Sequence, residues 1–112
     1  MIITKNKPFT QKEISSLKEY FKSYIKTVID LKNKSCSAGM EVHFEGEQIL
    51  LNQGAEQKNI WGGGVDLETK TIDFNAMINI RPRDDNNSNV IQDKKIRQKY
   101  EKLTKHFFKN IL

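Results

Sequence analysis

The stretch that decides the fold runs from Tyr24 to Phe44 and reads YIKTVIDLKNKSCSAGMEVHF. Two segments of it alternate between apolar and polar residues, and the turn residues Asn33-Lys34-Ser35 separate them. Because a strand points successive side chains to opposite faces, this period of two predicts strands over 24–31 and 36–44. The apolar side of the second strand comprises Cys36, Ala38, Met40, Val42 and Phe44.

Further strand patterns lie on both sides of this stretch. They are a short first strand at Ile2-Ile3, a strand at Val65–Leu67, and a long alternating strand at Thr71–Ile80. Glu45-Gly46 predicts a hairpin turn into a returning strand, although a short helix over 47–53 is an open alternative. Together these segments predict one antiparallel sheet of about five or six strands.

Two helices complete the predicted fold. Thr10 and Glu13 have the spacing of a capping box, and apolar residues follow at helical intervals. Asp93 can cap a final helix whose apolar stripe is Ile96, Tyr100, Leu103, Phe107 and Ile111. We therefore predict an α+β domain over 1–112, in which two amphipathic helices pack on one face of the sheet as a two-layer arrangement.

Composition narrows the class of protein. The 112 residues are 37% hydrophobic and 29% charged, which is typical of a globular domain. Cys36 is the only cysteine, so no internal disulfide and no multi-cysteine metal site can form. No apolar run approaches the length of a membrane helix, and the first residues lack a signal-peptide pattern. These features predict a cytoplasmic protein without a membrane partner, metal or cofactor.

The charge is concentrated in the C-terminal third. Residues 1–80 contain ten Lys/Arg and ten Asp/Glu, whereas residues 81–112 contain nine and four, which accounts for the entire net charge of +5. Nucleic acid or another anionic ligand would therefore bind through 81–112. A solvated, lysine-rich helix face explains the same charges without a ligand.

Four polar residues are expected to share the sheet face opposite the helices. Glu41 and His43 are two apart on one predicted strand, and Asn79 and Arg81 are two apart on another. A carboxylate beside an imidazole suits general acid–base catalysis, and an arginine beside an asparagine suits anion binding. A solvated strand face, or an ion pair between Arg81 and Glu41, is the structural alternative.

The segment Trp61-Gly62-Gly63-Gly64 is unusual in its three consecutive glycines. Exposed backbone N–H groups of such a segment can cradle a phosphate, although neither a Walker loop nor a dinucleotide fingerprint is present. A strand start anchored by a buried Trp61 is the alternative.

Several segments resemble a small prokaryotic family catalogued as a domain of unknown function. They are Gly39–His43, Gln53–Gln57, Ile60–Gly62, Met77–Pro82, Asn87-Ser88 and Ile96-Arg97. The chain departs from the family pattern at Ala55, at Gly64 and in the loop Asn86-Asn87-Ser88. The resemblance implies no activity, but it adds Gln57 to the candidate polar residues.

Three functions remain open from the sequence. The favoured one is a binding module for an anionic ligand that uses Arg81, Arg83, Lys94, Lys95 and Arg97, with the glycine segment nearby. The second is a small hydrolase or nuclease with His43 as general base and Glu41 orienting it, assisted by Asn79 and Arg81. The third is an interaction subunit that pairs, or forms an oligomer, through an exposed sheet edge or face.

Overall fold

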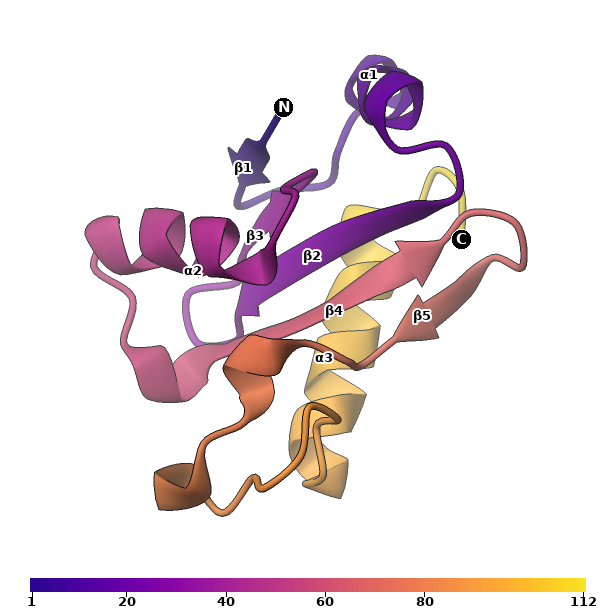
Figure 1. Cartoon of the computed structure of the whole chain (residues 1–112). Coiled ribbons are helices and arrows are strands. Elements are labelled where there is room, and N and C mark those ends of the chain that lie inside the picture. The colour runs from indigo at the N-terminus through magenta and orange to yellow at the C-terminus, as the bar shows by residue number, and fades with distance from the viewer.

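A computed structural model describes residues 1–112 as a five-stranded antiparallel sheet with helices on both faces (Figure 1). This architecture confirms the predicted α+β class. The helices and strands are β1 (Ile3–Lys5), α1 (Gln11–Tyr20), β2 (Tyr24–Asp30), β3 (Ser35–Ala38), α2 (His43–Asn52), β4 (Ile60–Asp66), β5 (Thr71–Asp73) and α3 (Lys94–Phe107). Single 3-10 turns at Gln57–Asn59 (η1), Met77–Asn79 (η2) and Pro82–Asp84 (η3) complete the chain.

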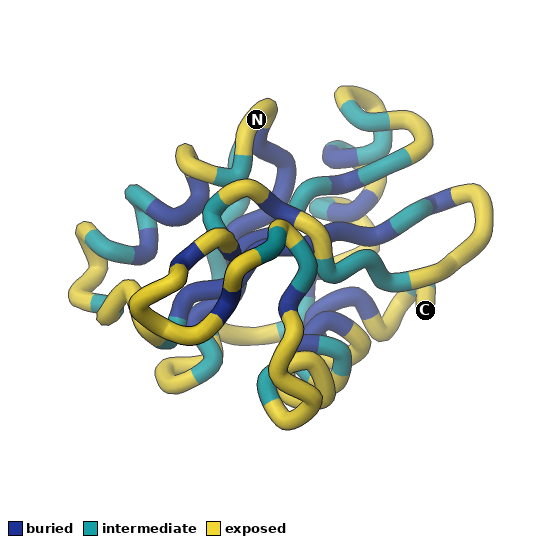
Figure 2. Tube along the Cα trace, turned by 60° about the horizontal axis from the view of Figure 1, so that its bottom comes forward, coloured by how far each residue is buried: buried dark blue, intermediate teal, exposed yellow.

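The sheet has the strand order β1-β3-β2-β4-β5. Strand β2 lies at its centre, where Ile29 pairs with Cys36 of β3 and Thr27 pairs with Gly63 of β4. Both β2 and β4 are buried along most of their length, and the exposed stretches concentrate in the connecting loops (Figure 2). The predicted strand over 24–31 is thus confirmed as the middle of the sheet.

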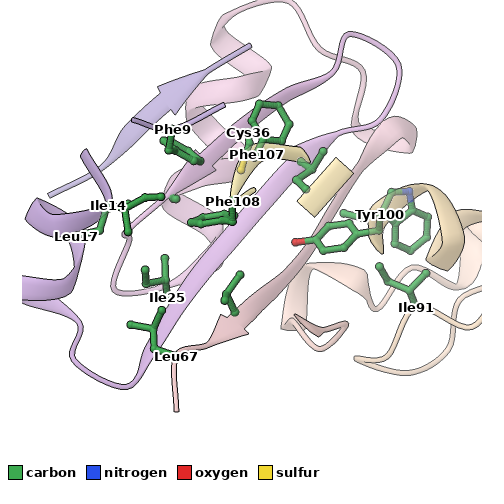
Figure 3. Packing of buried hydrophobic residues seen from close by; sticks show 14 residues of the cluster. Phe9, Ile14, Leu17, Ile25, Cys36, Leu67, Ile91, Tyr100, Phe107 and Phe108 are labelled. Carbon is green, nitrogen blue, oxygen red and sulfur yellow. The ribbon is translucent and has the colours of Figure 1, made fainter. Parts of the chain in front are cut away.

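Helices α1 and α3 cover one face of the sheet, as predicted. The capping box of α1 is present, because Thr10 accepts from the N–H of Glu13 and Glu13 accepts from the N–H of Thr10. Asp93 likewise caps α3 by accepting from the N–H of Ile96. The two helices enclose a core of 14 residues that includes Ile14, Leu17, Ile25, Tyr100 and Phe107 (Figure 3).

Helix α2 covers the opposite face, which was predicted to be open. It packs Leu50 against Val28 and Ile60 in a second, smaller core. A Cβ atom at Gly46 would lie 2.6 Å from the Met40 side chain and 2.9 Å from that of Val28, so the glycine lets the helix approach the sheet closely. The fold therefore has three layers rather than two, and α2 occupies much of the face proposed for pairing.

The predicted strand over 36–44 ends early, at Ala38. Gly39 has φ +89°, which takes the chain out of the strand, and Met40 then enters the core beneath α2. The side chain of Glu45 accepts from the N–H groups of Glu41 and Val42, which satisfies two free donors at the start of a helix. The hairpin predicted at Glu45-Gly46 is consequently wrong, and the helical alternative for the following residues is confirmed.

The predicted strand over 71–80 also ends early, at Asp73. Its start pairs with β4, where Ile72 lies opposite Val65. Beyond this point the chain forms η2 and η3 and returns through isolated bridges between Asn75 and Val90 and between Arg81 and Asn86. The apolar residues of 74–80 therefore belong to two different cores rather than to one strand face. Phe74 packs against the larger core beneath α1 and α3, and Ile78 packs against the smaller core beneath α2.

None of the helices is both long enough and apolar enough to span a lipid bilayer.

Candidate functional site

His43 is the first residue of α2, and its side chain contacts strand β4. Its Nε2 lies 2.7 Å from the carbonyl oxygen of Gly63. A carbonyl can only accept, so Nε2 carries the proton, and in the neutral ring Nδ1 is the unprotonated acceptor. Burial lowers the pKa of His43, and the nearby Lys26 ammonium lowers it further, which outweighs the opposite effects of the Gly63 carbonyl and Asp73. His43 is therefore neutral at pH 7.

Asn79 is completely buried and takes the place of a strand neighbour beside β4. Its Oδ1 accepts from the N–H of Gly62 at 2.9 Å, and its Nδ2 donates to the carbonyl oxygen of the same residue at 2.9 Å. Nδ2 also reaches the carbonyl oxygens of Phe74 and Asn89. These bonds occupy the whole amide group, which leaves it unable to bind a ligand.

Arg81 is also buried, with only 8% of its surface exposed. Its guanidinium stacks on the ring of Trp61 at 4.0 Å, and Nη1 donates to the carbonyl oxygen of Gln57 at 2.7 Å. Asp84 lies 3.3 Å from Nε and compensates the charge. Burial lowers the pKa of Arg81, whereas the carboxylates of Asp84 and Glu47 raise it. The expectation of a surface arginine at this position is wrong.

Three of the four predicted polar residues thus meet at β4, and one does not. His43, Asn79 and Arg81 contact Gly63, Gly62 and Trp61 in turn, along consecutive residues of the strand. Glu41 is exposed and precedes α2, and its backbone carbonyl oxygen accepts from Lys26 Nζ at 2.6 Å. The side chain of Glu41 makes no ion pair or hydrogen bond with His43, whose Nε2 binds the Gly63 carbonyl oxygen, so the structure does not form the expected carboxylate–imidazole pair.

The glycine segment is a buried strand rather than a loop. Gly62 and Gly63 lie within β4, where added Cβ atoms would meet Ala76 at 2.6 Å and the carbonyl oxygen of Asp73 at 2.2 Å. Close packing therefore requires the glycines, and Asn79 already occupies the N–H of Gly62. Trp61 is 2% exposed, in agreement with the anchoring role considered as the alternative.

The basic residues predicted for anion binding lie in separate places. Arg83 is exposed on η3, and Arg97 lies over the ring of Phe74 at 4.5 Å. Lys94 and Arg97 line a shallow depression together with Gln92, Gln98 and Glu101. Lys95 lies on a different side of α3 from this depression. It precedes Lys99, Lys102 and His106 by four, seven and eleven residues, and this spacing places it on the same side of the helix as those three residues.

This spacing places four basic residues in one line along α3. At 100° per residue, Lys95, Lys99, Lys102 and His106 fall within a narrow arc of the helix, and all four are exposed. We call this line the basic stripe. None of its lysines has a carboxylate within ion-pairing distance, whereas Lys105, on another side of the helix, pairs with Glu101.

The turn between β2 and β3 faces the basic stripe. The buried carboxylate of Asp30 fixes this turn by accepting from the N–H groups of Lys32 and Asn33 and from the Asn33 side chain. A further bond from the N–H of Leu31 to the carbonyl oxygen of Asn59 ties the turn to η1. Lys34 closes the turn in a left-handed conformation, φ 55°, and its ammonium group is unpaired.

A groove of about 450 Å³ lies between this turn and α3. Its floor is Leu31 and Leu103, and its walls are the basic residues Lys34, Lys99, Lys102 and His106. We call these six residues the basic groove. A second hollow of about 270 Å³ continues it past Leu31 and Lys99 toward Lys32 and Lys58. Glu56 partly neutralises that end, at 3.7 Å from Lys32 and 3.6 Å from Lys58.

No three His, Cys, Asp or Glu side chains cluster in a way that could hold a metal ion. The only cysteine, Cys36, is completely buried in β3, and its burial raises the pKa of the thiol. A buried thiol of this kind is neither a nucleophile nor a metal ligand at neutral pH.

A comparison with family models matches residues 1–107 to a family described as "Protein of unknown function (DUF5674)". The chain belongs to the DUF5674 family. No curated protein and no solved structure is significantly similar to the chain. Membership confirms the resemblance to a family of unknown function, and the DUF5674 match brings no reaction, ligand or partner with it.

In this DUF5674 chain, the segments that suggested the family have structural roles. His43 joins α2 to β4 through its bond to Gly63, and Asn79 and Arg81 join the 74–92 region to Gly62 and Trp61 of β4. The Nε and Nη2 atoms of Arg81 are buried without a hydrogen-bond partner. The basic groove lies elsewhere, and sequence analysis missed it. The spacing of Lys95, Lys99, Lys102 and His106 is a signal that could have revealed the stripe, whereas no sequence signal places Lys34 opposite to it.

Proposed function

We propose that the protein is a binding module for polyanions, that nucleic acid is its ligand, and that the basic groove is the binding surface. The observation that carries this proposal is a concave site lined by three lysines and a histidine with no carboxylate among its lining residues. Lysine ammonium groups that line one concave surface without counter-ions repel each other and create a positive potential that attracts phosphate. An anionic ligand stabilises such an arrangement.

The distribution of charge favours a polymer over a single phosphate group. The lysines of the basic stripe recur at intervals of one helical turn, so they form a row of charges rather than one compact cluster around a single point. A single phosphoryl or carboxylate group is commonly held by the planar fork of an arginine, and the groove contains no arginine. Repeated phosphates along a nucleic-acid backbone match a row of lysines.

The overall charge supports the same ligand. The excess of +5 belongs to residues 81–112, and α3 carries most of these cations on its exposed surface. The positive field of α3 would accelerate association with a polyanion at low ionic strength. Arg83, Lys94, Lys95 and Arg97 contribute to this field from outside the groove.

The catalytic alternative has less support. A hydrolase with His43 as general base requires Asn79 and Arg81 to stabilise developing charge, but the Asn79 amide is completely buried and bonded to Gly62, and Arg81 is buried against Trp61. Glu41 does not orient the imidazole, because the Gly63 carbonyl does. The sheet-pairing alternative is similarly weakened by α2, which packs on the face in question.

Fluorescence anisotropy with a labelled mixed-sequence oligonucleotide at about 50 mM salt tests the proposal. The groove variant combines Lys34→Gln, Lys99→Gln and Lys102→Gln. The control combines Lys7→Gln, Lys12→Gln and Lys22→Gln, which removes the same charge from exposed, unpaired lysines outside the groove. We expect the groove variant to lose at least ten-fold in affinity and the control to lose about two-fold. Equal losses would contradict a specific groove, and no binding by the wild type would contradict the function.

A further inference from the structure

The floor of the basic groove is apolar, and this limits the form of nucleic acid that fits it. Leu31 and Leu103 are half-buried and lie between the lysines of the walls. A ligand that contacts both parts of the site carries negative charges beside apolar groups. A duplex stacks its bases inside and presents a convex row of phosphates, so it would meet the lysines but leave the leucines uncovered. An unpaired strand exposes both phosphates and bases.

The wall of the groove also offers an aromatic surface. His106 is exposed, lies one turn beyond Lys102, and lines the groove beside Leu103. The edge-to-face arrangement of its ring with Phe107, with centroids 5.6 Å apart, holds the imidazole next to the buried end of the helix. Histidine is one of the side chains on which unpaired bases stack in single-strand recognition. No other aromatic ring lines this groove.

We infer that the basic groove binds single-stranded nucleic acid in preference to duplex. One base lies over Leu31 and Leu103 against the imidazole of His106. The flanking phosphates bind the ammonium groups of Lys34, Lys99 and Lys102. This inference rests on the proposed function, since it names the form of polyanion that the same groove accepts.

The volume of the groove agrees with this assignment. A space of about 450 Å³ admits a nucleotide-sized group but not the stacked pairs of a double helix. The adjoining hollow of about 270 Å³, which shares Leu31 and Lys99, continues the path for the next nucleotide. The strand would therefore lie across the β2–β3 turn, from the C-terminal half of α3 toward η1.

Competition between ligand forms tests the inference. Anisotropy at constant low salt compares a 12-nucleotide single strand, as DNA and as RNA, with the duplex of the same sequence and with a multiply phosphorylated peptide of similar charge. We expect either single strand to bind at least ten-fold more tightly than the duplex and the peptide. Duplex or peptide binding as tight as that of the single strands would overturn the inference and leave polyanion binding intact. Binding of none of them would contradict the proposed function itself.

Substitution of His106 separates stacking from charge. His106→Ala should weaken single-strand binding about ten-fold, as loss of one stacked base does, and leave duplex binding unchanged. His106→Phe should retain single-strand binding, because a phenyl ring stacks without carrying charge. If His106→Ala weakened single strand and duplex equally, or if His106→Phe failed to rescue, the imidazole would act through charge and the base-stacking assignment would be wrong. Thermal melting of both variants should match that of the wild type, since His106 is exposed.

Discussion

The side-chain amide of Asn79 pairs with the backbone of Gly62 as a neighbouring strand would, through one donated and one accepted bond of 2.9 Å each. Strand β5 has already ended at Asp73, so the edge of β4 beyond this point would otherwise be unpaired. Nδ2 of the same amide holds the carbonyl oxygen of Asn89 at 3.0 Å. The buried side chain of Asn79 thus joins residues 74–92 to the sheet, and the buried amide of Asn86 holds the same segment together by donating to the carbonyl oxygens of Asn79 and Val90.

Loss of the Asn79 amide should be costly. Asn79→Ala removes the partners of the N–H and the carbonyl oxygen of Gly62, and we expect the free energy of unfolding to fall by about 3 kcal/mol. The carbonyl oxygens of Phe74 and Asn89 keep the N–H groups of Ile91 and Ala76. Urea denaturation measures the change. Asn87→Ala is the matched control, because that side chain is exposed and makes no hydrogen bond, and it should change stability by less than about 0.5 kcal/mol. Similar values for both variants would show that the amide does not hold the loop.

Arg81 should also act on stability rather than on binding. Arg81→Ala removes the stack on Trp61 and the bond to the Gln57 carbonyl, so we expect a loss of about 2–3 kcal/mol in urea denaturation. Arg83→Ala, two residues later and exposed, should be nearly neutral. Both variants should bind oligonucleotide almost as the wild type does under native conditions. A folded Arg81→Ala protein that no longer binds would place the site at Arg81 instead.

The pH dependence of stability should reflect His43. Its pKa is lowered in the folded protein from the ordinary value of 6.5, so the unfolded chain binds the proton more tightly. The stabilisation is complete above pH 6.5 and is lost as pH falls through 6.5 and below it. We therefore expect a lower free energy of unfolding at pH 5.5 than at pH 7.5. His43→Gln keeps a donor near Gly63 but cannot titrate, and its stability should change less over this interval. An equal change in both proteins would assign the effect to other groups.

Much of the fold could be predicted because local signals and tertiary structure agree. Thr10 with Glu13 and Asp93 with Ile96 form the caps that their spacing indicates, and the alternation of 24–30 matches the central strand. In each case short-range geometry decides the outcome. Periodicity also identified the helix stripes that cover one face of the sheet.

The predicted strands over 36–44 and 71–80 were both too long, each for a physical reason. Apolar and polar residues continue to alternate beyond Gly39, which predicted a longer strand. The left-handed φ at Gly39 ends the strand, and the bonds that the Glu45 side chain accepts then start helix α2. Alternation also persisted through residues 74–80, where the amide of Asn79 replaces the backbone bonds that a strand would make. The periodicity of apolar and polar residues indicates which side chains are buried. It does not indicate which groups form hydrogen bonds with the backbone N–H and carbonyl groups.

The same limit explains the candidate site. His43, Asn79 and Arg81 do meet at β4, but each of them contacts the strand, and Asn79 and Arg81 are buried. The basic groove joins Lys34 to Lys99 and Lys102 across more than 60 positions of sequence. Only the packing of α3 beside the β2–β3 turn brings them together.

The salt dependence of oligonucleotide binding tests the central claim most directly. Each lysine that contacts a phosphate of a single strand should contribute about 0.7 to the slope of log K against log salt concentration. The variant with Lys34→Gln, Lys99→Gln and Lys102→Gln should therefore show a slope smaller by about 2 than the wild type, measured between about 50 and 200 mM salt. The Lys7→Gln, Lys12→Gln, Lys22→Gln control should retain the wild-type slope. Parallel lines for the groove variant and the wild type would contradict the assignment of the basic groove as the binding site.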